Sequence, residues 1–173
     1  MRIKDNGPAA GHVALDRDRS IGEPGVSPEL RSKILDILAR HNSMTIATLR
    51  PDGYPQATTV SYASDGPIIY FGCGVQSQKA QNIARDDRVS AAIDEDHANW
   101  AEIDGLSLAG RAARVTDPDE LAKANGLFTA KFPQVSAFSA DIRVAMDIFR
   151  VTPSVISVLD YTKGFGHSDL VAA

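Results

Sequence analysis

The segment from Tyr70 to Asp87, "YFGCGVQSQKAQNIARDD", contains residues suited to holding an anion. Its apolar run ends at Gly72 and Gly74, where backbone can come close to a ligand without side-chain obstruction. Ser77 and Lys79 follow at the start of a polar stretch with helical spacing. The start of a helix offers free N–H groups and a favourable dipole, to which a hydroxyl and a cation add donors. The segment therefore predicts a phosphate site where a strand gives way to a helix.

The same two side chains also have ordinary structural interpretations. Ser77 is a typical helix N-cap, and capping alone would account for a serine at this position. Lys79 can equally carry a solvated charge, which is the commonest environment of a lysine. The residues by themselves leave both interpretations open.

Two other groups of reactive residues favour structural roles. Cys73 is the single cysteine, which excludes an intrachain disulfide and suits a reducing compartment. No histidine lies beside it in the sequence, so we interpret it as a small buried residue rather than a nucleophile. Residues 94–97, "DEDH", have metal-ligand side chains without the spacing of an EF-hand, and they predict a solvated loop. No metal site is expected.

The composition is that of one globular domain. The chain has 173 residues, of which 43% are hydrophobic and 23% charged, enough for a sizeable core. A net charge of -4 argues against nucleic-acid binding, which usually needs a basic face. No apolar run approaches the roughly 20 residues that span a bilayer, and the first residues lack the apolar core of a signal peptide. We therefore expect a cytoplasmic protein that does not bind membranes.

The chain divides into an arm and one domain. Residues 1–26 mix glycine, proline and charges without a period, and they predict an arm that is loose or packed on a partner. Residues 27–173 form the domain, which begins with a helix capped by Ser27. Leu30, Ile34, Ile37 and Leu38 lie on one face of that helix.

The remaining pattern is dominated by strands. Strands are predicted over residues 44–49, 54–62, 68–71, 88–94 and 106–115, and further helices over 77–85 and after an Asp117 cap. Residues 133–145 predict a loop with a short helical turn. Residues 146–166 predict a hairpin-like pair in which Pro153 marks a break or an edge position. Helices occur only between groups of strands, which favours an antiparallel barrel over a doubly wound sheet.

In order and in residues, the chain resembles the pyridoxamine 5'-phosphate oxidase-like family of FMN-binding split barrels from about Pro28 to Asp160. The segments that carry the resemblance are "MTIATLRPDGYPQATTVSY", "IIYFGCGVQSQKAQNIARDDRVSAAI", "SLAGRAARVTDPDELAKA" and "PSVISVLDYTKGFG". The resemblance implies a mainly β fold, a six- to seven-stranded antiparallel split β-barrel with flanking helices. It also implies a homodimer with FMN in a groove at the interface.

The resemblance assigns candidate cofactor-binding residues in three groups. The phosphate would be held by Ser77, Gln78 and Lys79. The second strand would lie along the flavin with Thr58, Thr59, Val60 and Ser61, although ordinary β-propensity also accounts for its threonines and serine. The end of the third strand would approach it with Phe71, Gly72 and Cys73.

Departures from the family's named enzyme indicate a different substrate. That enzyme has basic residues on its second strand, where this chain has "TTVSY", and a glutamine-bearing pattern where this chain has "LSLAG". We therefore expect an FMN-dependent oxidoreductase on a small organic substrate other than pyridoxamine 5'-phosphate. No catalytic side chain is identified, because the flavin itself carries the chemistry. The alternatives are a non-catalytic carrier or sensor of flavin, deazaflavin or haem, and a structural barrel whose anion site is empty.

Two aromatic segments leave alternatives open. Trp100 predicts either a core anchor or an interface residue. Residues 160–170, "DYTKGFGHSDL", are unusual for a free tail. Lys163, Gly164 and Phe165 are expected to fold over the flavin edge or a partner, or to belong to a docked strand end.

Overall fold

The computed structural model describes residues 26–137 and 145–172. The predicted arm, residues 1–26, lies outside the described residues apart from Val26. The helices are α1 Pro28–Arg40, α2 Gln78–Arg85 and α3 Pro118–Lys131, with short turns η1 Trp100–Glu102, η2 Pro133–Ala137 and η3 Tyr161–Lys163. The strands are β1 Ser43–Leu49, β2 Pro55–Asp65, β3 Ile68–Gly74, β4 Arg88–Asp94, β5 Asp104–Arg114, β6 Met146–Asp160 and β7 Ser168–Ala172. No helix among these residues is long and apolar enough to span a membrane.

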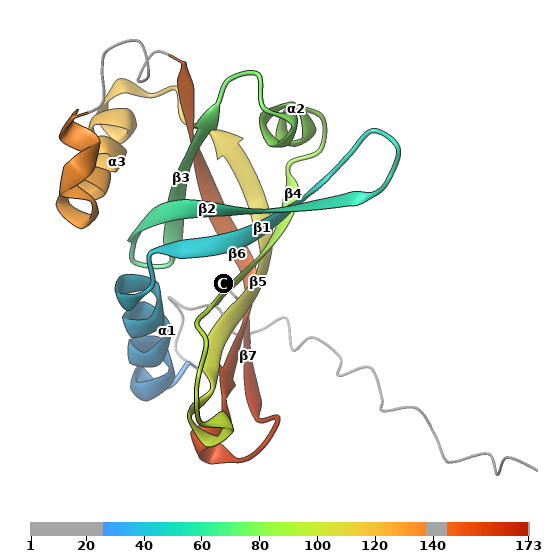
Figure 1. Cartoon of the computed structure of the whole chain (residues 1–173), viewed down its shortest axis with the longest axis vertical. Helices are drawn as coiled ribbons and strands as arrows, with labels where there is room; N and C mark the ends of the chain where they lie inside the picture. Colours follow the sequence, from blue (N-terminus) through green and yellow to red (C-terminus); the bar gives the residue numbers. More distant parts are fainter. Residues whose placement is uncertain (1–25, 138–144, 173) are drawn as a thin grey trace, which may run out of the picture.

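The strands form one antiparallel sheet that closes on itself (Figure 1). Its order is β3-β2-β1-β4-β5-β6-β7, and a further pairing of β3 with β6 closes six strands into a barrel. β7 is an added strand beside β6. The predicted antiparallel barrel with flanking helices is therefore confirmed.

The predicted hairpin over residues 146–166 is wrong, because β6 runs without a break from Met146 to Asp160. Pro153 is at a local edge, as one of the two interpretations predicts, because the pairing with β3 ends at Val151 and the pairing with β7 begins at Val155, which leaves β5 as its strand partner in the described residues. A β-bulge accommodates it: Ala109 of β5 pairs with Val155, whereas Gly110 pairs with Pro153. Proline has no N–H for the ladder, so it is tolerated at a bulge or where one side of the strand is unpaired.

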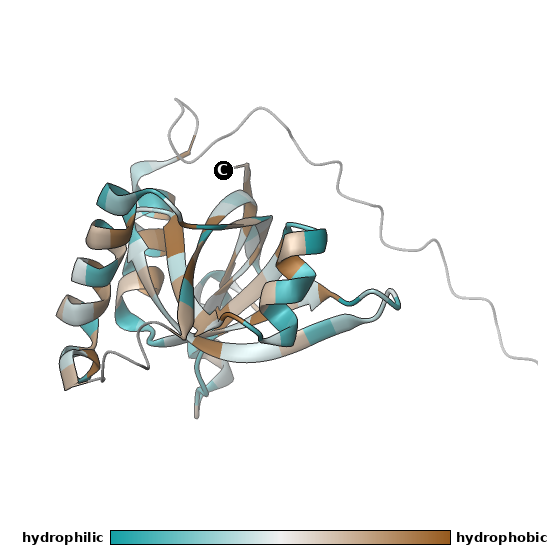
Figure 2. Ribbon diagram, turned by 90° about the horizontal axis from the view of Figure 1, so that it is seen from above, coloured by the Kyte–Doolittle hydropathy of each residue, from teal (hydrophilic) through white to brown (hydrophobic). Residues whose placement is uncertain are grey.

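Apolar side chains fill the barrel and close one of its ends. Phe71 of β3 and Phe149 of β6 stack inside it with ring centroids 5.4 Å apart. α1 contributes Ile34, Ile37 and Leu38, all buried, as its helical spacing predicts. Figure 2 shows the hydrophobic residues concentrated on the barrel strands. A second, smaller core lies between α3 and the outside of the sheet, around Tyr70 and Ala124.

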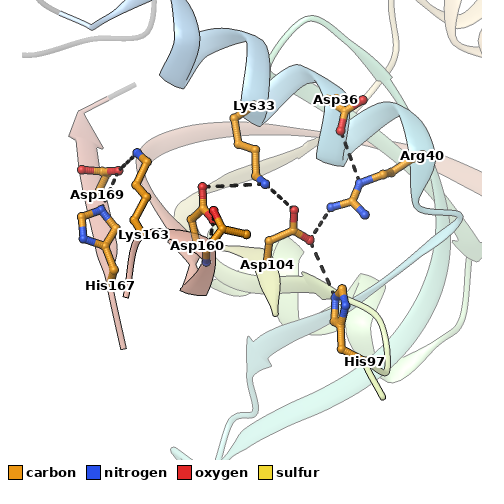
Figure 3. Close-up of polar contacts among 10 residues, drawn as sticks. Lys33, Asp36, Arg40, His97, Asp104, Asp160, Lys163, His167 and Asp169 are labelled. Atoms are coloured by element: carbon orange, nitrogen blue, oxygen red, sulfur yellow. Dashed lines mark hydrogen bonds and ion pairs between the residues drawn. The ribbon is translucent and has the colours of Figure 1, made fainter. Parts of the chain in front are cut away.

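A cluster of charged residues fixes α1 to the sheet (Figure 3). Asp104 of β5 lies between Lys33, whose Nζ is 2.6 Å from its carboxylate, and Arg40. Asp160 of β6 lies 3.8 Å from the same lysine nitrogen. Burial acts to raise the pKa of Asp104, but hydrogen bonds from Arg40 and Lys33 outweigh it and leave the pKa below its usual range. Asp104 is therefore held ionised in the folded protein.

Substituting Asp104→Asn should lower the free energy of unfolding by about 2 kcal/mol near pH 7, because two cations lose a nearly buried partner. The folded pKa is lowered, so this contribution is present above the unfolded value of about 3.9 and is lost as the pH falls through the folded pKa. Urea unfolding from pH 7 to pH 2.5 should show the two proteins converging below about pH 4.

The matched control is Asp36→Asn, which removes a largely exposed partner of Arg40. It should change stability by less than about 0.5 kcal/mol. A difference between wild type and Asp104→Asn that persists unchanged at pH 2.5 would contradict the assignment.

The predictions for Trp100 and for residues 160–170 have different outcomes. Trp100 is 68% exposed, so the core-anchor interpretation is wrong and the interface role stays a prediction. The C-terminal segment docks as a strand end, with β7 on β6 and Lys163 paired to Asp169 at 2.9 Å. Phe165 packs on Tyr161 and remains 81% exposed. Of the "DEDH" loop, Glu95 and Asp96 are exposed and His97 is half-buried.

Candidate cofactor groove

A groove of about 1030 Å³ lies beside the ends of β3 and β6. Strands and the start of α2 form one part of its lining, with Thr59, Val60, Ser61, Gly72, Cys73, Gly74, Lys79, Arg114, Val115, Met146, Asp147 and Ile148. α3 and η2 form the other, with Leu121, Asn125, Phe128, Thr129, Phe132, Gln134, Val135 and Ser136. Its volume is at the upper end of the range typical of small-molecule sites.

An opening in the sheet leaves part of β2 free to face this groove. β2 pairs with β3 only from Tyr62 to Asp65, whereas the preceding residues, 55–61, pair only with β1. The other edge of that segment therefore has no strand partner in the described part of the chain. Thr59, Val60 and Ser61 lie on this segment and line the groove.

Lys79 supplies a positive charge at the start of α2. Its side chain is half-buried and lines the groove, and no hydrogen bond or ion pair ties it to another described residue. Its positive charge acts to lower the pKa of the Cys73 thiol. A bound anion would give this cation a partner.

Ser77 and Gln78 are occupied by contacts within the protein. The Ser77 hydroxyl accepts a hydrogen bond from the Ala80 N–H at 3.3 Å, so its interpretation as an N-cap is confirmed. The Gln78 amide donates to Asn82 at 2.9 Å. Asn82 is completely buried and in turn donates to Thr48 and Gln56, which fixes α2 to β1 and β2. Neither Ser77 nor Gln78 lines the groove, and their phosphate role stays a prediction.

The structure separates the ten predicted site residues into two sets. Six line the groove: Thr59, Val60, Ser61, Gly72, Cys73 and Lys79. Four do not: Thr58, Phe71, Ser77 and Gln78. Phe71 points into the barrel and is fully buried. The Thr58 hydroxyl is buried without a hydrogen-bond partner in the described residues.

Cys73 is buried at the edge of the groove, as the sequence predicts for a structural cysteine. Burial raises the pKa of its thiol, while the Ser77 hydroxyl and the charge of Lys79 act in the opposite direction. The thiol is therefore protonated at neutral pH and is a poor nucleophile. Among the described residues no group of three or more His, Cys, Asp or Glu side chains is placed to hold a metal ion.

The groove also contains an ion pair and an aromatic wall that were not predicted from the sequence. Arg114 and Asp147 form a salt bridge of 2.6 Å between β5 and β6. Phe128 of α3 and Phe132, the C-cap residue that follows the helix, stack with ring centroids 6.2 Å apart. The four-residue spacing of the two phenylalanines was a signal, since such residues share one helix face. No local sequence pattern indicates the ion pair, because Arg114 and Asp147 are far apart in the chain.

The fold and the groove define the class of protein, and similarity to known proteins gives the family. A closed six-stranded antiparallel barrel with an added strand and an open edge is a split barrel. Residues 30–160 match the family model of pyridoxamine 5'-phosphate oxidase, and the chain belongs to that family. A comparison with curated proteins gives no match.

Solved structures with the same fold include two heme proteins and a conserved hypothetical protein. A heme binding protein from Mycobacterium smegmatis has a TM-score of 0.70 and 24% identity over 85% of this chain, which spans only 59% of that protein. A conserved hypothetical protein from Mycobacterium tuberculosis has a TM-score of 0.66 and 25% identity, covering 79% of this chain and 88% of the other. The heme storage protein HutZ from Vibrio cholerae has a TM-score of 0.58 and 17% identity, covering 74% and 89%.

Proposed function

We propose that the chain binds FMN in this groove and acts as an oxidoreductase on a small organic substrate other than pyridoxamine 5'-phosphate. The observation that carries the proposal is Lys79, a half-buried cation without a partner in the described residues, at the start of a helix and inside a groove of cofactor size. Membership of the pyridoxamine 5'-phosphate oxidase family supports it.

The residues present fit the chemical needs of FMN. Its phosphate needs a cation and N–H donors, which Lys79 and the first turn of α2 can supply. Its ring needs polar groups along one edge, and Thr59 and Ser61 provide hydroxyls in the groove. When bound, FMN would supply the redox chemistry, and the chain would position the ring and exclude water.

A haem or deazaflavin carrier is the second candidate function. Side chains in the groove that could ligate haem iron are those of Cys73 and Met146, and no histidine of the described residues lines it. The thiol is protonated, which makes it a poor ligand. A deazaflavin with a phosphate group would use the same cation as FMN. These features favour a flavin-type cofactor over haem.

We further propose a homodimer in which a second copy covers the groove. The unpaired edge of residues 55–61 of β2 lies beside the groove and would be shielded by a partner. Sedimentation at micromolar concentration should give a dimer, and a monomer that still binds FMN tightly would contradict this arrangement. A cytoplasmic location is also proposed, because the single cysteine needs no oxidising compartment.

The absorbance spectrum of the purified protein, before and after incubation with FMN and desalting, tests the cofactor. We expect flavin bands that are retained on the protein, bleach when a nicotinamide donor reduces the flavin without oxygen, and return when an electron acceptor is added. A Soret band would support the haem carrier instead. Retained flavin that no donor reduces would support a non-catalytic carrier, and a colourless protein after incubation with FMN would contradict FMN binding.

A further inference from the structure

The groove has an apolar wall that the cofactor proposal does not use. α3 has 14 residues, and Ala124 alone is buried. Phe128, Phe132 and, on η2, Val135 are half-buried and line the groove. Apolar side chains that line a concave site are typical of ligand-binding surfaces.

Polar contacts at both ends of α3 fix this wall in place. Near its start, the Glu120 carboxylate accepts hydrogen bonds from Arg150 at 3.0 Å and from the Tyr70 hydroxyl at 3.1 Å. At its end, Lys131 donates to the carbonyl oxygens of Leu38 at 3.2 Å and His41 at 2.5 Å. These contacts attach α3 to the sheet and to the end of α1, so the groove is built into the folded chain.

The charges in the groove select the kind of ligand. The charged side chains that line it in the described part of the chain are Lys79, Arg114 and Asp147. Arg114 is 60% exposed and pairs with Asp147 through one terminal nitrogen. A guanidinium has five N–H donors in a planar fork, so it retains donors for a second carboxylate. The groove is therefore net positive and complementary to an anion.

We infer that this end of the groove binds an aromatic carboxylate, with its ring against Phe128 and Phe132 and its carboxylate on Arg114. Arg114, Phe128 and Phe132 line the same groove, so a ligand bound there can meet both the cation and the apolar wall. The inference rests on the proposed function in one respect: the bound molecule is a substrate only if the chain is an oxidoreductase. Its binding does not require FMN.

The test is calorimetric titration of the full chain with 2-naphthoate, with and without FMN. The cation 2-naphthylmethylammonium, which has the same ring, serves as the comparison. Naphthoate should bind at least tenfold more tightly than the ammonium compound. Arg114→Gln should weaken naphthoate binding roughly tenfold and remove the preference for the anion, because a charge-assisted hydrogen bond is lost. Phe132→Ala should weaken it roughly fivefold, because ring stacking is lost.

Two control variants change matched residues outside the groove. Arg111→Gln removes a similarly exposed arginine of the same strand, and Phe165→Ala removes an exposed aromatic ring. Both should leave naphthoate affinity unchanged. Phe132→Leu, which keeps an apolar side chain in case the alanine variant unfolds, should give an intermediate loss.

Three outcomes would overturn the inference. The ammonium compound could bind as tightly as naphthoate, or the control variants could weaken binding as much as the groove variants. Phe132→Ala could also shift sedimentation from dimer to monomer without altering naphthoate affinity, and the wall would then belong to an interface between copies. FMN titration of the same samples keeps the two proposals separate, since a chain that binds naphthoate and not FMN contradicts only the proposed function.

Discussion

Substituting Lys79→Ala should weaken FMN binding by about 10- to 150-fold, the range expected for loss of a charge-assisted contact to phosphate. Lys79 lines the groove, and no hydrogen bond or ion pair joins it to another described residue, so its removal should leave the fold intact. Quenching of flavin fluorescence on binding measures the affinity directly. Riboflavin, which lacks the phosphate, should bind wild type and variant equally.

Lys123→Ala is the matched control for this substitution. Lys123 is also on a helix, but it pairs with Asp65 and does not line the groove. It should leave FMN affinity unchanged. Equal FMN affinity in wild type and Lys79→Ala would mean that the phosphate is held elsewhere, and no FMN binding by either would favour a barrel whose anion site is empty.

Substituting Gly110→Ala should lower the free energy of unfolding by about 3 kcal/mol or more. A Cβ at this position would lie 2.4 Å from the Thr152 carbonyl oxygen and 2.9 Å from the Pro153 Cα. Both atoms belong to the backbone of β6, so no side-chain rotation relieves the clash. β5 and β6 would have to separate at the bulge, and urea unfolding should show the loss as a lower midpoint.

Gly126→Ala makes the same chemical change but should raise, rather than lower, the free energy of unfolding. Gly126 lies within α3, and a Cβ there would meet nothing within 4 Å. Alanine should stabilise the helix by up to about 1 kcal/mol. An unchanged midpoint for Gly110→Ala would show that the register of β5 and β6 differs from the one described.

Local sequence signals predicted most of the fold. Ser27, Ser77 and Asp117 were each predicted as helix caps, and each accepts a hydrogen bond from the first turn of its helix. Such signals succeed because the capping residue and its partner are three positions apart. The bulge at Pro153 could not be predicted, because its partner Gly110 lies on another strand.

The same distinction explains what was predicted of the groove. Lys79 was found because it follows a strand end and a cap in the sequence. Arg114 and Asp147 were missed because only the pairing of β5 with β6 brings them together. Phe71 was assigned to the ligand with its neighbours in the sequence. Its ring stacks on Phe149 within the barrel, and its contact with a cofactor stays a prediction.

The most direct test of the account is a crystal structure of the chain with FMN. We predict that the phosphate will lie about 3 Å from the Lys79 side-chain nitrogen, with the flavin ring along Thr59 and Ser61. FMN bound at a different surface, or a groove that stays without FMN while Lys79 points into solvent, would contradict it.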